Sequence, residues 1–173
     1  MLDWAVGKNA PVLIINADIH LQMAPWEMKR IRWLSDGGIC AFIRHNHNGD
    51  FNRTTPEFHG LDAFLFHGRD AIMFPDSFLS MGQPFWDFWL PYTFASQIRP
   101  IYIAEFPAAF HQSHPSSWSW ETWYRCGLEF DRLTGELCQD QSFEAYHAMS
   151  GRVRGLLDQK KISLNTGDFH GKS

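Results

Sequence analysis

The 173-residue chain lacks the features that mark several large classes of protein. It has no run of Lys or Arg, and its formal net charge of -4 argues against a nucleic acid or an anionic membrane as its main partner. No apolar stretch approaches the roughly 18 to 20 residues that cross a bilayer, so no membrane span is expected. Internal repeats and low-complexity tracts are absent as well. We therefore predict one globular domain over residues 1–173.

Cysteine is scarce and irregularly placed. The three cysteines, Cys40, Cys126 and Cys138, are an odd number at unequal spacing. This arrangement favours reduced thiols over a disulfide framework, and therefore a cytoplasmic location. The zinc-protease pattern HExxH is also missing from the sequence.

Aromatic residues, by contrast, are abundant. They make up 16% of the chain, with 15 Phe and 8 Trp. Such side chains fill cores more often than they bind ligands, but their flat faces also stack on sugar rings. The surplus therefore supports a carbohydrate ligand only weakly.

The pattern of apolar residues predicts an α/β fold, with a mixed sheet flanked by helices. Apolar and β-branched segments predict strands at residues 12–15, 39–45, 61–67 and 99–105. Spacing of three and four residues predicts helices at 25–34, from Trp86 onward, at 117–133 and at 140–157. The helix from Trp86 carries an apolar stripe of Trp86, Trp89, Leu90, Thr93 and Phe94. Turn-forming residues predict loops at 46–56 and 75–84, and the last dozen residues are expected to fray.

The triplet Asn16-Ala17-Asp18 ends the first predicted strand. Ligands of open α/β sheets bind at the C-terminal edge of the strands, so this triplet is a candidate site. A carboxylate beside a small residue and an amide suits a hard divalent cation that bridges a diphosphate. We predict Asp18 as a ligand of Mn²⁺ or Mg²⁺, and Asn16 as a substrate-binding residue. The competing interpretation is that Asp18 only caps the turn that follows.

Residues 82–90 (GQPFWDFWL) present one Asp and two Trp at the start of a helix. Asp87 could cap its own helix, or it could act as the general base that takes the proton of an attacking hydroxyl group. Trp86 and Trp89 would then hold the sugar ring beside it. Asp62, near the start of the third predicted strand, is a further candidate for binding the hydroxyl groups of a substrate.

Nine histidines leave room for metal chemistry. His45 and His47 would share one face of a strand, and His111 and His114 lie within one helical turn of each other. If Asp18 binds a cation, His111 at the end of the last predicted strand is the best second ligand. A small zinc hydrolase built on these histidines is an alternative.

Three segments together resemble a known family. They are IINADI at 14–19, GLDAFLF at 60–66 and GQPFWDFW at 82–89. The combination is similar to the glycosyltransferases of the A-type nucleotide-sugar fold, over about residues 10–115. The resemblance implies transfer of a sugar from a nucleotide-sugar to a carbohydrate acceptor, with a divalent cation on the donor diphosphate. By position it assigns metal binding to Asp18 and His111, and the role of base to Asp87.

The chain departs from this family in two respects. The first acid of the family's Asp-x-Asp motif is Asn16 here, which weakens cation binding or makes it depend on His111. The strands that bind the nucleotide precede this motif in the family and have no counterpart before Pro11. We therefore expect a partial domain, in which nucleotide binding is supplied by a second chain or by further sequence, or has been lost. A non-catalytic carbohydrate- or protein-binding module is the alternative function.

Overall fold

The computed structural model describes residues 2–114, 119–135, 143–165 and 167. These residues form a mixed six-stranded sheet of order β1-β4-β3-β5-β2, with β6 beside β5. The strands are β1 (Pro11–Ile15), β2 (Ile19–Leu21), β3 (Ile39–His47), β4 (Thr55–His67), β5 (Ile101–Gln112) and β6 (Lys161–Leu164). The helices are α1 (Pro25–Leu34), α2 (Trp86–Ser96), α3 (Trp120–Thr134) and α4 (Phe143–Lys160), with 3-10 turns η1 (Leu2–Trp4) and η2 (Gly68–Met73). The predicted α/β class, with a mixed sheet and flanking helices, is confirmed.

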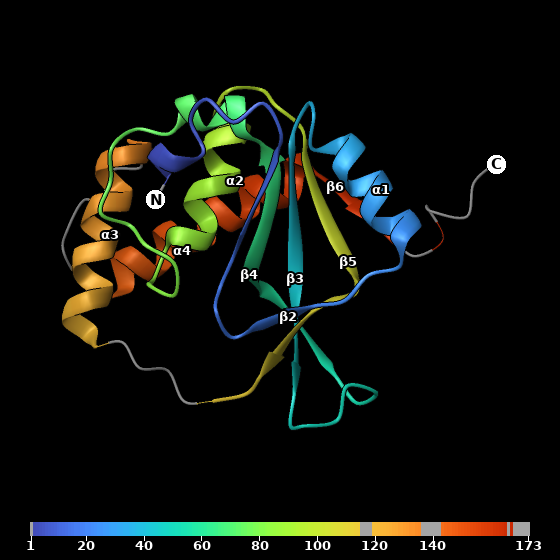
Figure 1. The fold of residues 1–173 in the computed structure, drawn as a ribbon. Helices are drawn as coiled ribbons and strands as arrows, with labels where there is room; N and C mark the ends of the chain where they lie inside the picture. The colour runs from blue at the N-terminus through green and yellow to red at the C-terminus, as the bar shows by residue number, and fades with distance from the viewer. Residues whose placement is uncertain (1, 115–118, 136–142, 166, 168–173) are drawn as a thin grey trace.

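Helices cover both faces of the sheet. Helix α1 lies on one face, while α2, α3 and α4 lie on the other (Figure 1). The central strand β3 explains why both faces are covered, because its side chains alternate between two apolar clusters. Ile39, Ala41 and Ile43 pack with α2, whereas Cys40 and Phe42 pack with the residues under α1. A strand buried on both faces reads as a continuous apolar run, which is why this strand is visible in the sequence.

Several strands extend further than the sequence predicts. Strand β3 continues to His47 and β4 begins at Thr55, so the predicted loop at 46–56 is wrong at both ends. The polar residue Asn46 belongs to the sheet because it pairs with Thr55 of β4 and His111 of β5. Strand β5 likewise runs to Gln112 instead of ending at residue 105. Pairing across the sheet thus overrides the local preference of polar residues for turns.

Two predicted elements have a different environment from the one expected. Strand β1 is an edge strand and not a buried one, and Leu13 on its outer side is 40% exposed. Helix α2 begins at Trp86 as predicted, but it has no single apolar stripe. Phe88 and Pro91 are buried as well as the predicted face, because α2 is enclosed between the sheet and α4.

The remaining elements agree with the prediction to a variable extent. Helix α1 has the predicted bounds, with Pro25 in its first turn. Helices α3 and α4 were expected to begin at residues 117 and 140, which lie outside the described part of the chain. The irregular segment at 75–84 is confirmed. The short strands β2 and β6 were not predicted, and β6 from its second residue onward falls in the segment expected to fray.

Candidate functional site

The strand ends that carry the predicted residues lie at one edge of the sheet. Strands β1 and β3 are both antiparallel to β4, and β3 is parallel to β5, so β1, β3 and β5 run in the same direction. Their C-terminal ends therefore meet at the same edge. After Asp18 the chain crosses this edge and pairs with β5 as strand β2, with Ile19 opposite His111. This crossing brings Asp18 to the end of β5.

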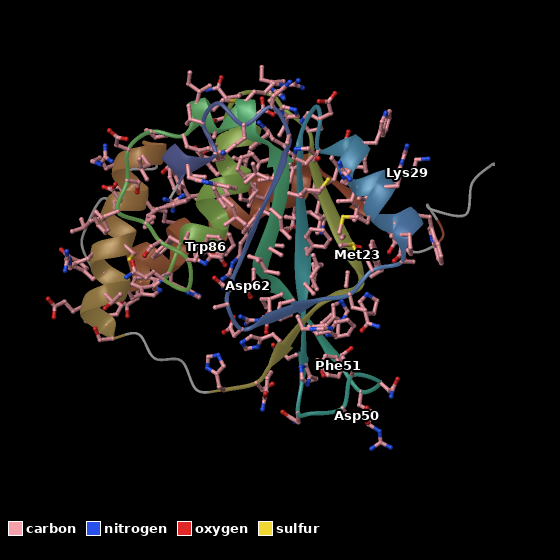
Figure 2. All side chains as sticks on the ribbon, in the orientation of Figure 1. Met23, Lys29, Asp50, Phe51, Asp62 and Trp86 are labelled. Atoms are coloured by element: carbon pink, nitrogen blue, oxygen red, sulfur yellow. The ribbon has the colours of Figure 1, made fainter. Side chains whose placement is uncertain are left out.

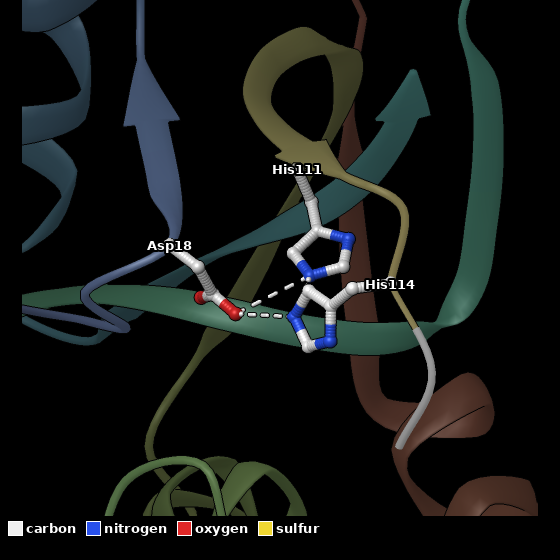
Figure 3. A group of neighbouring side chains, drawn as sticks. All are labelled: Asp18, His111 and His114. Carbon is white, nitrogen blue, oxygen red and sulfur yellow. Dashed lines mark hydrogen bonds and ion pairs between the residues drawn. The ribbon is translucent and has the colours of Figure 1, made fainter. Parts of the chain in front are cut away.

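Asp18, His111 and His114 converge on one point (Figure 3). The Oδ2 atom of Asp18 lies 3.3 Å from Nε2 of His111 and 3.0 Å from Nε2 of His114. The two Nε2 atoms are 3.2 Å apart. The three potential ligand atoms thus form a nearly equilateral triangle. Asp18 and His111, predicted as a metal-binding pair, are neighbours, and His114 completes the group.

The dimensions of this triangle suit a divalent transition metal. A tetrahedral ion with bonds of about 2.0–2.1 Å separates its ligand atoms by about 3.3–3.4 Å, and adjacent octahedral ligands at about 2.1 Å lie about 3.0 Å apart. The observed separations of 3.0, 3.2 and 3.3 Å lie at or between these values. Two imidazoles and one carboxylate match the preferences of Zn²⁺, Mn²⁺ or Fe²⁺ better than those of Mg²⁺, which takes oxygen ligands.

Asn46 sets the orientation of His111. Its Oδ1 atom is 3.0 Å from Nδ1 of His111. An amide oxygen only accepts, so Nδ1 of His111 carries the proton and Nε2 turns its lone pair toward Asp18 and His114. Such a second contact commonly holds a metal-ligating histidine in the correct tautomer.

The charge states of the group are also favourable for a cation. Burial, followed by the charge of Arg44, lowers the pKa of His111, so this imidazole is neutral at neutral pH as a ligand must be. Burial opposes the ionisation of Asp18, but the hydrogen bonds from His114 and from the backbone N–H of Asp18 hold the pKa of Asp18 below its ordinary value. Asp18 therefore remains a carboxylate.

Asp62 is fixed in the wall beside this group by two irregularities of β4. Phe42 pairs with Ala63 and Ile43 with Leu61, so Asp62 has no direct partner on β3, and a second register shift follows at 58–60. Bulges of this kind turn a side chain out of the regular alternation. The carboxylate accepts hydrogen bonds from Asn16 Nδ2 at 2.7 Å and from Arg44 Nη1 at 2.9 Å. Asn16 and Asp62, both predicted to bind substrate, thus bind each other.

Asp87 occupies the first turn of α2 and does not cap it. The N-cap position belongs to Phe85, which makes no side-chain capping bond, and Asp87 Oδ1 accepts a 3.1 Å bond from the adjacent backbone N–H of Phe88. Phe85 has a left-handed φ of 69°, a strained conformation for a bulky residue. Its ring is held between Trp123 and Phe130, at centroid distances of 5.1 and 5.4 Å. This packing fixes the backbone that presents Asp87.

The environment of Asp87 changes its acidity. Burial, followed by the negative charge of Asp62, raises the pKa of the Asp87 carboxyl to about 7. Asp62 in turn interacts with the charges of Asp18 and His111. Asp62 therefore lies between the metal-ligand group and Asp87. A carboxyl group with a pKa near 7 can both accept and release a proton at neutral pH.

One polar cavity of about 430 Å³ joins these residues. Its predicted members are Asn16, Asp18, Asp62, Trp86, Asp87 and His111. The charged or aromatic side chains of the lining that the sequence prediction did not assign to any site are Arg44, Glu57, Phe85, Phe88, Trp123 and Arg154. Asp62 of β4 and Trp86 of α2 both line this cavity and are labelled near each other in Figure 2. Segments that are up to 138 residues apart in the chain, from Asn16 to Arg154, thus line the same space.

The predicted tryptophans do not form an open platform. Trp86 is 4% exposed and packs edge-on against Phe64 at 5.2 Å. Trp89 is 6% exposed and lines a second cavity of about 230 Å³, whose lining residues are mostly apolar. At the site cavity, helix α3 supplies Trp123, which lines the cavity and stacks at 5.0 Å on Trp120, and Trp120 is 48% exposed.

The other predicted histidines belong to the opposite face of β3. His45 and His47 alternate with Asn46 along the strand, and Asn46 faces His111. His47 instead packs on Phe51 at 4.3 Å. Of the four histidines proposed as alternatives for a zinc site, His111 and His114 lie together beside Asp18, whereas His45 and His47 lie on the other face of the strand.

None of the protein-family models matches the chain, and no curated protein and no solved structure is similar enough to count as a match. Within the described residues, no helix is long and apolar enough to cross a bilayer.

Proposed function

We propose that the chain binds a divalent cation at Asp18, His111 and His114 and transfers a sugar from a nucleotide-sugar to a carbohydrate acceptor. The observation that supports this most is the presence, in one cavity, of three convergent metal ligands and of a carboxyl group whose pKa is raised to about 7. The resemblance of residues 10–115 to A-type glycosyltransferases agrees with it.

The proposed reaction divides the work between two parts of the cavity. The cation, Mn²⁺ rather than Mg²⁺ for this ligand set, would neutralise the charge that develops on the leaving diphosphate. The acceptor hydroxyl oxygen would attack the anomeric carbon while the bond from that carbon to the diphosphate breaks. Asp87, in its ionised form, would take the hydroxyl proton. Trp123, instead of the buried Trp86 and Trp89, would contact the acceptor ring.

A thermal-shift experiment tests the metal and nucleotide together. A ligand present at 100 times its Kd adds about 2.7 kcal/mol of stability, which for a domain of this size raises Tm by about 5–10 °C. We expect Mn²⁺ with UDP or GDP to give such a rise in the wild type and none in Asp18→Asn. Asp158→Asn, which changes a carboxyl group outside the cavity, is the matched control and keeps the full rise. Absence of a shift with every nucleoside diphosphate would contradict the proposal.

A metal-dependent hydrolase is the second candidate. It is favoured by the number of ligands, because three protein ligands beside an open cavity are typical of catalytic zinc sites. Zinc in the purified protein and hydrolysis of simple phosphate or carboxylate esters without any nucleotide-sugar would favour this candidate. Protein that contains no zinc would dismiss it.

A further inference from the structure

Arg154 is a cation of the site cavity that the proposed reaction does not use. It belongs to α4 and reaches the cavity wall, where its guanidinium carbon lies 5.0 Å from the centroid of the Phe88 ring. Its Nε atom is buried and has no hydrogen-bond partner within the described residues. A buried donor that is left unpaired carries a free-energy cost, which is larger when the donor is charged. Because this Nε atom has almost no accessible surface, a ligand in the cavity would bind the other N–H groups of the guanidinium.

Arg44, the second guanidinium in the cavity, is committed to the protein. Its Nη1 atom donates to Asp62 at 2.9 Å, and this ion pair balances its charge. Its Nε atom likewise has no hydrogen-bond partner in the described part of the chain, but it lies against the backbone of Gly60, where an added Cβ atom would be only 3.0 Å away. That side of Arg44 is closed to a ligand.

Asp87 only partly compensates the charge of Arg154. The two groups interact electrostatically, yet burial and Asp62 outweigh this attraction and keep the pKa of Asp87 at about 7. About half of the Asp87 carboxyl groups are therefore neutral at pH 7. Within the described residues, Arg44 forms an ion pair with a carboxylate, whereas Arg154 forms none.

We propose that Arg154 binds an anionic substituent, a carboxylate or a phosphate, on the sugar that occupies the cavity. The acceptor is then a sugar acid or a phosphorylated sugar. Anion binding follows from the cavity itself, whereas the identification of the ligand as a sugar rests on the proposed function. The contact with Phe88 holds one face of the guanidinium and leaves its N–H edge for a planar or tetrahedral anion.

Isothermal titration calorimetry with glucose, glucuronate, glucose 6-phosphate and inorganic phosphate tests this assignment. We expect glucuronate or glucose 6-phosphate to bind at least about tenfold more tightly than glucose, and the two anionic probes distinguish a carboxylate from a phosphate. Arg154→Gln should weaken the preferred anionic probe by about 10- to 100-fold, with little effect on glucose. Arg152→Gln, an exposed arginine on the same helix, carries the same change of charge and should leave binding intact.

Several results would overturn the assignment. These are equal affinities for glucose and both anionic probes, an unchanged affinity in Arg154→Gln, or inorganic phosphate binding as tightly as glucose 6-phosphate. If Arg154→Gln fails to fold, Arg154→Lys keeps the charge but loses the planar fork, and unchanged binding in that variant also contradicts the proposal. Failure of nucleotide and Mn²⁺ to stabilise the protein, with Arg154-dependent anion binding retained, would refute the proposed function alone.

Discussion

Replacing Asp87 with asparagine removes a carboxyl group that the folded protein ionises only with difficulty. Burial and the charge of Asp62 raise the pKa of this carboxyl to about 7, whereas an aspartate of the unfolded chain has a pKa of about 3.9. Between about pH 4 and pH 7 the unfolded chain therefore ionises Asp87 while the folded protein keeps it protonated. The free energy of unfolding falls as the pH rises through this window and levels off above it.

The size of the effect follows from the difference between the two pKa values. Each pH unit inside the window costs about 1.4 kcal/mol, and the whole window costs at most about 4 kcal/mol. Asparagine has the same shape, carries no charge and can still accept the bond from the N–H of Phe88. We expect Asp87→Asn to be more stable than the wild type at pH 7, with an advantage about 2–3 kcal/mol larger than at pH 5.

Urea unfolding followed by tryptophan fluorescence measures this difference. Comparison with the variant cancels the contributions of the histidines, which titrate in the same range in both proteins. Asp158→Asn, at an exposed carboxyl, is the control and should show no such pH dependence. An advantage of Asp87→Asn that is the same at pH 5 and pH 7 would refute the reasoning.

Two further substitutions test the local structure. Gly38→Ala should lower the free energy of unfolding by about 1–3 kcal/mol, because its Cβ would collide with the carbonyl oxygen and ring of Pro100. The added Cβ of Gly37→Ala would meet no atom within 4 Å. Equal losses of unfolding free energy in the two variants, measured by urea unfolding, would therefore contradict the role of the collision with Pro100. Asn46→Ala should weaken Mn²⁺ binding by about 10- to 100-fold in a calorimetric titration, since it releases the orientation of His111. Asn48→Ala, in the exposed turn, serves as its control, and a fully retained affinity in Asn46→Ala would count against the role of Asn46.

The core helices and strands and part of the site can be predicted from the sequence. β3 is predictable because its apolar run is buried on both faces, and α1 because Pro25 marks its start. Asp18 and His111 can be paired from the sequence because each lies at or just after the C-terminal end of an apolar strand. Their contact depends on β2, whose three residues carry no pattern of their own.

The parts that could not be predicted depend on distant segments. Trp86 and Trp89 resemble a sugar platform in sequence, but α4 and the sheet enclose their helix. Arg154 lies 67 residues after Asp87, on a helix whose sequence shows no sign of the cavity. Asp62 reaches Asn16 and Arg44 through bulges that no local residue pattern specifies. Only the tertiary structure brings these groups together.

A titration of Mn²⁺ followed by electron paramagnetic resonance tests the central claim most directly, because the signal of the free ion disappears when the ion is bound. Wild-type protein should remove the signal of one equivalent of Mn²⁺ per chain. Asp18→Asn and His111→Gln should leave most of that signal in place, while Asp158→Asn should behave like the wild type. Equal loss of signal in Asp18→Asn and the wild type would show that Asp18, His111 and His114 do not form the metal site.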